Sequence, residues 1–267
     1  MATLKGPLQF TGSLGTMRSY YDKDSGKQIL SSKGGVNKNI VKSNKSLARV
    51  RDMNREFIAC NIWAKLVRRG TEDMSYLKNG RINGKLVSIA KVLQKMSSED
   101  TYGYRRIESS KFNYPLMGFS MNNAHPFNTV FQLEPEISIT EDRSEVTLCL
   151  NNFISNGAFK WQERISYYRV YLTIVELQDI VWDAVHKSYL PVYLPFSLRK
   201  KTNVSDWILV SCDPVDFLIT ASFDQNALPR EKTTVLVAMG LEFASGMQYN
   251  TPYVVKDHGT MAIIGCL

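Results

Sequence analysis

The C-terminal half of the chain holds a series of short runs rich in β-branched and aromatic residues, and this series constrains the fold more than any other feature. The first run, Glu145–Leu150, alternates and places Val146, Leu148 and Leu150 on one face of a strand. Similar runs follow over residues 168–176, 207–212, 217–223, 233–243 and 260–266. Because turns separate the runs, residues 126–267 predict an antiparallel β domain, either a β-sandwich or a jelly-roll-like domain.

The first 45 residues predict a small β-hairpin followed by a basic linker. Residues 7–34 contain two short β-prone runs on either side of the polar turn Asp22–Gly26, a pattern typical of a hairpin. Residues 33–45 contain Gly34 and Gly35 and few side chains that could form a core. We expect this linker to be irregular, and mobile when the chain is alone in solution.

Two helices are predicted after the linker. Residues 46–69 form the clearest helical pattern, and Gly70 follows at the position of a C-terminal stop. Apolar residues recur in this helix at steps of three and four and form one expected core stripe, Leu47, Val50, Met53, Phe57, Ile58 and Leu66. A second helix is expected over residues 83–97, and the two helices are expected to pack as an antiparallel pair.

Together these elements predict an α+β protein with two parts. The chain has 267 residues, of which 44% are hydrophobic and 22% are charged, so a sizeable core can be buried. Residues 1–125 are expected to form a basic region with the β-hairpin and the antiparallel helix pair. Residues 126–267 are expected to form the β domain, with the boundary near the end of the loop-like segment 101–121.

The two parts differ in charge. Residues 1–125 hold 22 Lys and Arg against 9 Asp and Glu, whereas residues 126–267 hold 11 against 16. The densest basic stretch runs from Lys27 to Arg69, and Asp52 and Glu56 are its only acidic residues. Three interpretations stay open: contact with the phosphates of nucleic acid, head-to-tail contact with the acidic part of another copy, and a solvated face that keeps the protein in solution.

A second basic segment interleaves its cations with aromatic side chains, namely Tyr102, Tyr104, Arg105, Arg106, Lys111 and Phe112. Such aromatics can stack on nucleobases while the basic side chains follow a phosphate backbone. Alternatively, the aromatics pack between the two parts of the chain or against a neighbouring subunit. The residues expected to bind a partner, either another subunit or nucleic acid, are Lys27, Lys33, Lys38, Lys42, Lys45, Arg49, Arg51, Arg55, Arg105 and Arg106.

The sequence contains no motif for catalysis or cofactor binding. His125, His186 and His258 are its only histidines, and neither metal-binding spacings nor nucleophile motifs occur. Segment Gly80–Lys85 lacks the spacing and the Ser or Thr of a phosphate-binding loop. The four cysteines are far apart and are expected to be buried free thiols. We therefore expect no enzyme activity, no cofactor, no metal and no small-molecule substrate.

Neither a secretory signal nor a membrane span is expected. The start of the chain, Met1–Pro7, has no basic region followed by an apolar one, and no apolar run approaches the roughly 20 residues of a membrane helix. We expect a cytoplasmic protein, or one that becomes part of an assembled particle or is exported by a non-classical route.

The first 70 residues resemble uncharacterised proteins of Bacteroidota. The resemblance is carried by a GxxGxxxxY hairpin from Gly12 to Tyr20, by Gly26-Lys27, and by the basic segment Ser32–Gly35, which an Arg-rich helix follows. It implies a bacterial or bacterial-virus origin and no particular activity.

The leading hypothesis from the sequence is a non-enzymatic structural protein that assembles with itself, as a subunit of a filament, shell or appendage. Contacts between the basic arm of one copy and the acidic domain of the next would hold the assembly in part. The alternative is a nucleic-acid-binding protein that uses the basic residues 27–69.

Overall fold

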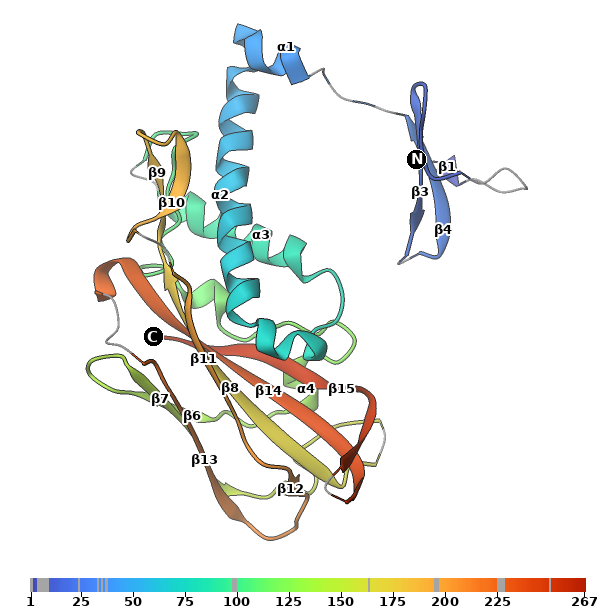
Figure 1. Cartoon of the computed structure of the whole chain (residues 1–267), viewed down its shortest axis with the longest axis vertical. Coiled ribbons are helices and arrows are strands. Elements are labelled where there is room, and N and C mark those ends of the chain that lie inside the picture. Colours follow the sequence, from blue (N-terminus) through green and yellow to red (C-terminus); the bar gives the residue numbers. More distant parts are fainter. Residues whose placement is uncertain are drawn as a thin grey trace. The chain divides into compact units, whose positions relative to one another are not determined.

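The computed structural model describes the chain apart from residues 1, 4–9, 24, 33, 35, 37, 98–99, 163, 195–196, 225–228 and 250. It divides the chain into two compact units, Met1–Arg51, here called the N-terminal unit, and Asp52–Leu267, here called the body. The fold is α+β with antiparallel sheets, as the sequence predicts (Figure 1).

The N-terminal unit contains a four-stranded antiparallel sheet with the strand order β1-β4-β3-β2. The strands are β1 (Ala2–Thr3), β2 (Gly12–Leu14), β3 (Met17–Asp22) and β4 (Lys27–Ser32). Strands β3 and β4 pair along their whole lengths and confirm the predicted hairpin. Gly26 has a φ of +64°, which is the left-handed conformation that the turn between them requires.

The predicted irregular linker is partly helical. It contains α1 (Lys38–Ser43) and the short 3₁₀ turn η1 (Lys45–Leu47), which leads into α2 (Ala48–Gly70). Asn44 starts the turn, because its side-chain oxygen accepts a hydrogen bond from the Ser46 backbone N–H at 3.0 Å.

The body is built on a six-stranded antiparallel sheet with the order β11-β8-β14-β15-β5, in which β12 also pairs with β8. Its strands are β5 (Phe119–Ser120), β8 (Tyr167–Gln178), β11 (Arg199–Val204), β12 (Ile208–Leu209), β14 (Thr233–Gln248) and β15 (Thr251–Cys266). A second sheet has the order β13-β7-β6, with β6 (Glu136–Ile139), β7 (Glu145–Phe153) and β13 (Val215–Ser222). A separate hairpin joins β9 (Ile180–Asp183) to β10 (Ser188–Pro191).

The large sheet is buried on both faces, and this explains the long apolar run that forms β8. On one face of β8, Leu172 and Ile174 share a core with Leu148 of the three-stranded sheet. On the other face, Tyr171 and Val175 belong to a second core, which the helices cover. The body therefore has three layers: a small sheet, a large sheet and a helical layer (Figure 1).

The helical layer consists of α2, η2 (Glu72–Leu77), α3 (Ile82–Met96), η3 (Tyr114–Leu116) and, beside the sheet edge, α4 (Phe127–Val130). The predicted helix pair is present. However, α3 crosses α2 instead of lying antiparallel along it (Figure 1). The end of α2 packs directly on the large sheet. A Cβ added at Gly70 would lie only 2.4 Å from Cγ1 of Val175. Only glycine fits there.

The expected boundary between residues 125 and 126 does not separate compact units. Trp63 of α2 and Leu86 of α3 share one buried core with Val175 and Leu236 of the large sheet. The helices therefore bury one face of the large sheet and belong to the same compact unit. The boundary between the two compact units lies after Arg51.

The two compact units divide the charged residues differently from the two parts that the sequence predicts. The N-terminal unit holds 10 Lys and Arg against 2 Asp, whereas the body holds 23 against 23. The whole net charge of +8 thus lies in the first 51 residues. The acidic excess predicted for residues 126–267 is balanced by the basic helical region in the same compact unit.

Candidate interaction surfaces

One face of the sheet in the N-terminal unit exposes three apolar side chains beside the buried polar pair Ser19 and Gln28. Cross-strand neighbours share a face, and the register pairs Leu14 with Met17 and places Tyr21 on the same side of β3. These three side chains are 64%, 44% and 56% exposed. Among the side chains described between residues 10 and 51, only Ser19 and Gln28 are buried, and both are polar. The described part of this unit has no apolar core of its own.

The predicted partner-binding cations of the N-terminal unit divide into two groups. The exposed ones are Lys27, Lys38, Lys42, Lys45 and Arg49. Arg51 has a local role instead, since its guanidinium donates to the carbonyls of Val41 and Asn44 at 2.8 and 2.7 Å and ties α1 to the start of α2. Lys33 lies outside the described residues.

Arg105 is engaged within the body by a buried carboxylate. Glu56 faces inward from α2, and Arg105 donates to both of its oxygens at 2.7 and 2.6 Å. Lys91 of α3 and the backbone N–H of Gly103 donate to the same carboxylate at 2.5 and 2.8 Å. Burial raises the pKa of Glu56, but these hydrogen bonds outweigh burial and lower the pKa to about 2. Glu56 is thus a structural anion that fastens segment 101–106 to both helices.

The other two arginines of this region are also engaged. The Arg55 guanidinium lies 4.1 Å from the centre of the Tyr104 ring and 5.3 Å from that of Trp182. Arg106 donates to both oxygens of Asp100 at 2.7 Å. The arginines of this segment are therefore held by groups of the body, whereas Tyr102 and Tyr104 remain 38% and 40% exposed.

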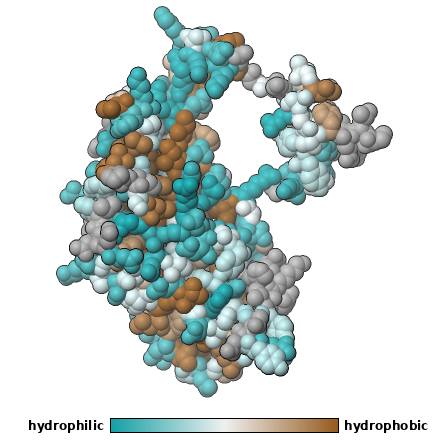
Figure 2. All heavy atoms as spheres, in the orientation of Figure 1, coloured by the Kyte–Doolittle hydropathy of each residue, from teal (hydrophilic) through white to brown (hydrophobic). Residues whose placement is uncertain are grey.

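Helix α2 carries an exposed apolar stripe in the body. Met53, Phe57 and Ile58 are 55%, 55% and 56% exposed, although the sequence places them in the core stripe. The buried face contains Glu56, Cys60 and Trp63, and of the predicted stripe only Leu66 is buried. Figure 2 shows a band of hydrophobic side chains along this helix.

The segment from Val204 to Leu218, here called the acidic segment, joins exposed apolar side chains to exposed carboxylates. It contains Asp206, Asp213 and Asp216 and no Lys or Arg. None of these carboxylates forms a salt bridge with a residue that the structure describes. Its exposed apolar residues are Val204, Leu209, Val215 and Leu218.

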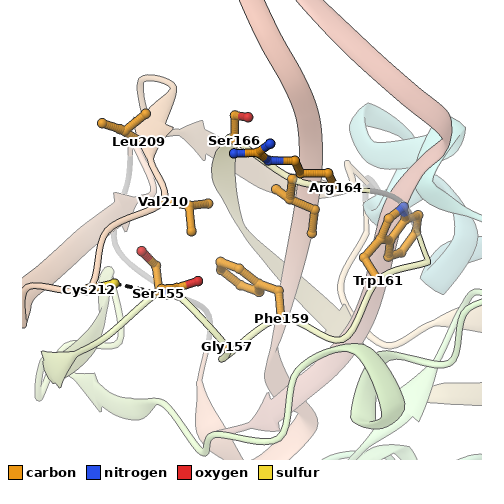
Figure 3. A pocket seen from close by; sticks show the side chains of 11 residues that line it. Ser155, Gly157, Phe159, Trp161, Arg164, Ser166, Leu209, Val210 and Cys212 are labelled. Carbon is orange, nitrogen blue, oxygen red and sulfur yellow. Dashed lines mark hydrogen bonds between the residues drawn. The ribbon is translucent and has the colours of Figure 1, made fainter.

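A depression of about 590 Å³ borders the acidic segment. Figure 3 shows Cys212 and Ser155 at one end, Trp161 at the other and the Phe159 ring between them. The Cys212 sulfur accepts a hydrogen bond from Asn156 at 2.9 Å. Neither Cys212 nor Ser155 has a histidine among its described hydrogen-bond partners.

The four cysteines are free, and only two of them are buried as expected. Burial raises the pKa of Cys60 to about 11 and that of Cys266 to about 12. Cys149 is partly exposed and Cys212 is exposed. Within the described part of the chain, no three His, Cys, Asp or Glu residues lie close enough together to hold a metal ion. No described helix is long and apolar enough to cross a membrane.

Comparison with protein-family models, with curated proteins and with solved structures finds no match to this chain. The functional argument therefore rests on the surfaces described above.

Proposed function

We propose that this chain is a non-enzymatic structural protein that assembles with copies of itself through the N-terminal unit. The observation that carries the proposal is that no apolar side chain described between residues 10 and 51 is buried. A small sheet gains stability in water when it packs one apolar face against a helix or another sheet. A surface that covers the face with Leu14, Met17 and Tyr21 would supply that packing.

Burial of these three side chains would favour association. Complete burial of one large apolar side chain contributes about 1.5–3 kcal/mol. Three such side chains would therefore supply several kcal/mol toward the entropic cost of binding. The six-residue helix α1 buries none of its side chains and adds no core to the unit.

The acidic segment of another copy is the surface that we propose as the receptor. Its charge of −3 opposes the net +8 of the N-terminal unit, and both surfaces expose apolar side chains. Attraction between the two charges would orient the docking, and apolar contact would stabilise it. Contact between different surfaces on successive copies is heterologous, so it leads to rings or to open filaments. A filament, shell or appendage subunit fits this geometry.

Light scattering on the purified full-length chain tests the proposal. We expect oligomers at about 50 mM salt that become smaller in 1 M salt, where the Debye length falls to about 3 Å. The triple variant Leu14→Ser, Met17→Ser, Tyr21→Ser should remain monomeric under both conditions. Its matched control is Val185→Ser, which removes an exposed apolar side chain from the β9–β10 turn and should assemble normally. A wild-type chain that is monomeric at high concentration in both salts would rule out the proposal.

One observation supports polyanion binding as a second candidate function. The net charge of +8 is confined to 51 residues, and a cation-rich surface of this kind binds phosphates with strong salt dependence. A titration of duplex DNA and of single-stranded RNA from about 50 to 200 mM salt tests it. Absence of binding to both at the lowest salt would exclude this function.

A further inference from the structure

The C-terminal end of α2 forms one side of a strongly basic pocket. The pocket has a volume of about 440 Å³ and is lined by Lys65, Arg68, Arg69, Glu72, Ser75, Lys78 and Ile82. Lys65, Arg68 and Arg69 are spaced by three and four residues, so their side chains share one face of the helix. The chain then turns through η2 and returns Lys78 to the same pocket.

The cations of this pocket outnumber the available carboxylates. Glu72 is the only acid in the lining, and it already accepts a hydrogen bond from Lys200 at 2.8 Å. Lys200 also binds Asp73 at 2.9 Å, so these two acids are engaged. By contrast, no salt bridge links Lys65, Arg68 or Arg69 to any residue in the described part of the chain.

Lys78 lies in this pocket with neutral hydrogen-bond acceptors. Its ammonium donates to Thr71 Oγ1 at 2.9 Å and to the Arg68 carbonyl at 3.3 Å, and neither acceptor is an anion. Burial and the neighbouring Arg68 guanidinium lower the pKa of Lys78 to about 8. A bound anion would relieve both the repulsion and the loss of hydration.

We infer that this pocket is a binding site for a small phosphate-bearing anion. Guanidinium groups match the oxygens of phosphate in a two-pronged geometry, and a lysine adds a point charge. The Ser75 hydroxyl in the lining offers one more donor. The volume falls within the usual range for small-ligand sites, which begins near roughly 300 Å³. This site lies in the body and does not depend on assembly through the N-terminal unit.

Calorimetric titration of inorganic pyrophosphate into the full-length chain at about 50 mM salt tests the inference. We expect one site per chain and a loss of affinity of at least about tenfold in Arg68→Gln, because a charge-assisted hydrogen bond is removed. The control, Lys95→Gln, removes one exposed positive charge from α3 outside the pocket lining and should change the affinity less than about twofold. Unchanged circular dichroism will show that both variants are folded.

Two results would overturn the inference. One is the absence of binding at millimolar pyrophosphate. The other is an equal loss of affinity in Arg68→Gln and Lys95→Gln, which would indicate diffuse attraction instead of a site. A parallel titration with a nucleoside diphosphate identifies the source of the phosphate. If the nucleoside diphosphate binds more tightly than pyrophosphate, the pocket holds the phosphate end of a larger molecule. If the two ligands bind equally, the pocket holds the inorganic anion.

Discussion

The Arg105 guanidinium binds both carboxylate oxygens of Glu56, at 2.7 and 2.6 Å, and this pair fastens the loop after α3 to the buried face of α2. Lys91 reaches the same carboxylate from α3. The most basic stretch of the sequence thus contains a buried anion whose cationic partners come from other parts of the body.

Removal of Arg105 should destabilise the body strongly. In Arg105→Met the buried carboxylate loses two hydrogen bonds, and breaking a buried ion pair from one side costs about 3–5 kcal/mol. Urea denaturation of the two proteins measures this difference. The control Arg69→Met removes an exposed arginine from the same helical layer and should cost less than about 0.5 kcal/mol. Equal stability of Arg105→Met and the wild type would contradict a structural role for the pair.

Glu56 should also make the body sensitive to acid. Its pKa is lowered in the folded state, so its contribution is complete above the unfolded value of 4.5 and is lost as the pH falls through about 2. We expect the stability of the wild type to decline over this window. Glu56→Gln should be less stable at neutral pH and should lose less between pH 5 and pH 2. Denaturation curves at several pH values compare the two slopes, and parallel slopes would contradict the assignment.

The register of α2 against the core predicts a large effect for one of its aromatic residues and a small effect for another. Trp63→Ala should cost about 3–5 kcal/mol, because Trp63 is fully buried and its removal leaves a cavity. Phe57→Ala should change the stability of the body by less than about 0.5 kcal/mol, because the ring is more than half exposed. The comparison is made by urea denaturation at low protein concentration. A large loss of stability in Phe57→Ala would contradict the exposed position of this side of α2.

Two glycines in helices should respond differently to alanine. Gly70→Ala places a methyl group 2.4 Å from Val175 and should cost about 1–3 kcal/mol through overpacking. Gly84→Ala in α3 meets nothing within 4 Å and should stabilise the protein by about 0.4–1 kcal/mol, because alanine favours the helix. Thermal melting measures both changes. The same sign for both variants would contradict close packing of α2 on the sheet.

The elements could be predicted from the sequence better than their arrangement. Alternation in Glu145–Leu150 identifies β7, because one face of that strand is buried and the other is partly exposed. The β8 run, which Arg169 and Thr173 interrupt, does not alternate in this way, so the burial of both faces of the strand could not be predicted from it. The domain boundary was then misplaced, since a sheet with two buried faces needs the helices as its second cover.

The candidate surfaces were harder to predict, because charge in a sequence does not reveal pairing. Glu56 lies within the most basic stretch of the sequence, whereas the Arg105 guanidinium that compensates its buried charge lies 49 positions away. The steps of three and four residues between apolar positions place Phe57 and Ile58 in the expected core stripe, but both are exposed. Arg68 and Arg69 lie in the last turn of α2, and the return of the chain through η2 brings Lys78 into the same pocket.

Cross-linking between isotopically distinct copies tests the central claim most directly. Equal amounts of light and ¹⁵N-labelled chain are mixed and treated with a carbodiimide, which couples lysine ammonium groups to carboxylates. We predict links that join Lys27, Lys38 or Lys42 of one isotope to Asp206, Asp213 or Asp216 of the other. Links from these lysines that form only within single chains, or the absence of links to the acidic segment, would contradict docking of the N-terminal unit on another copy.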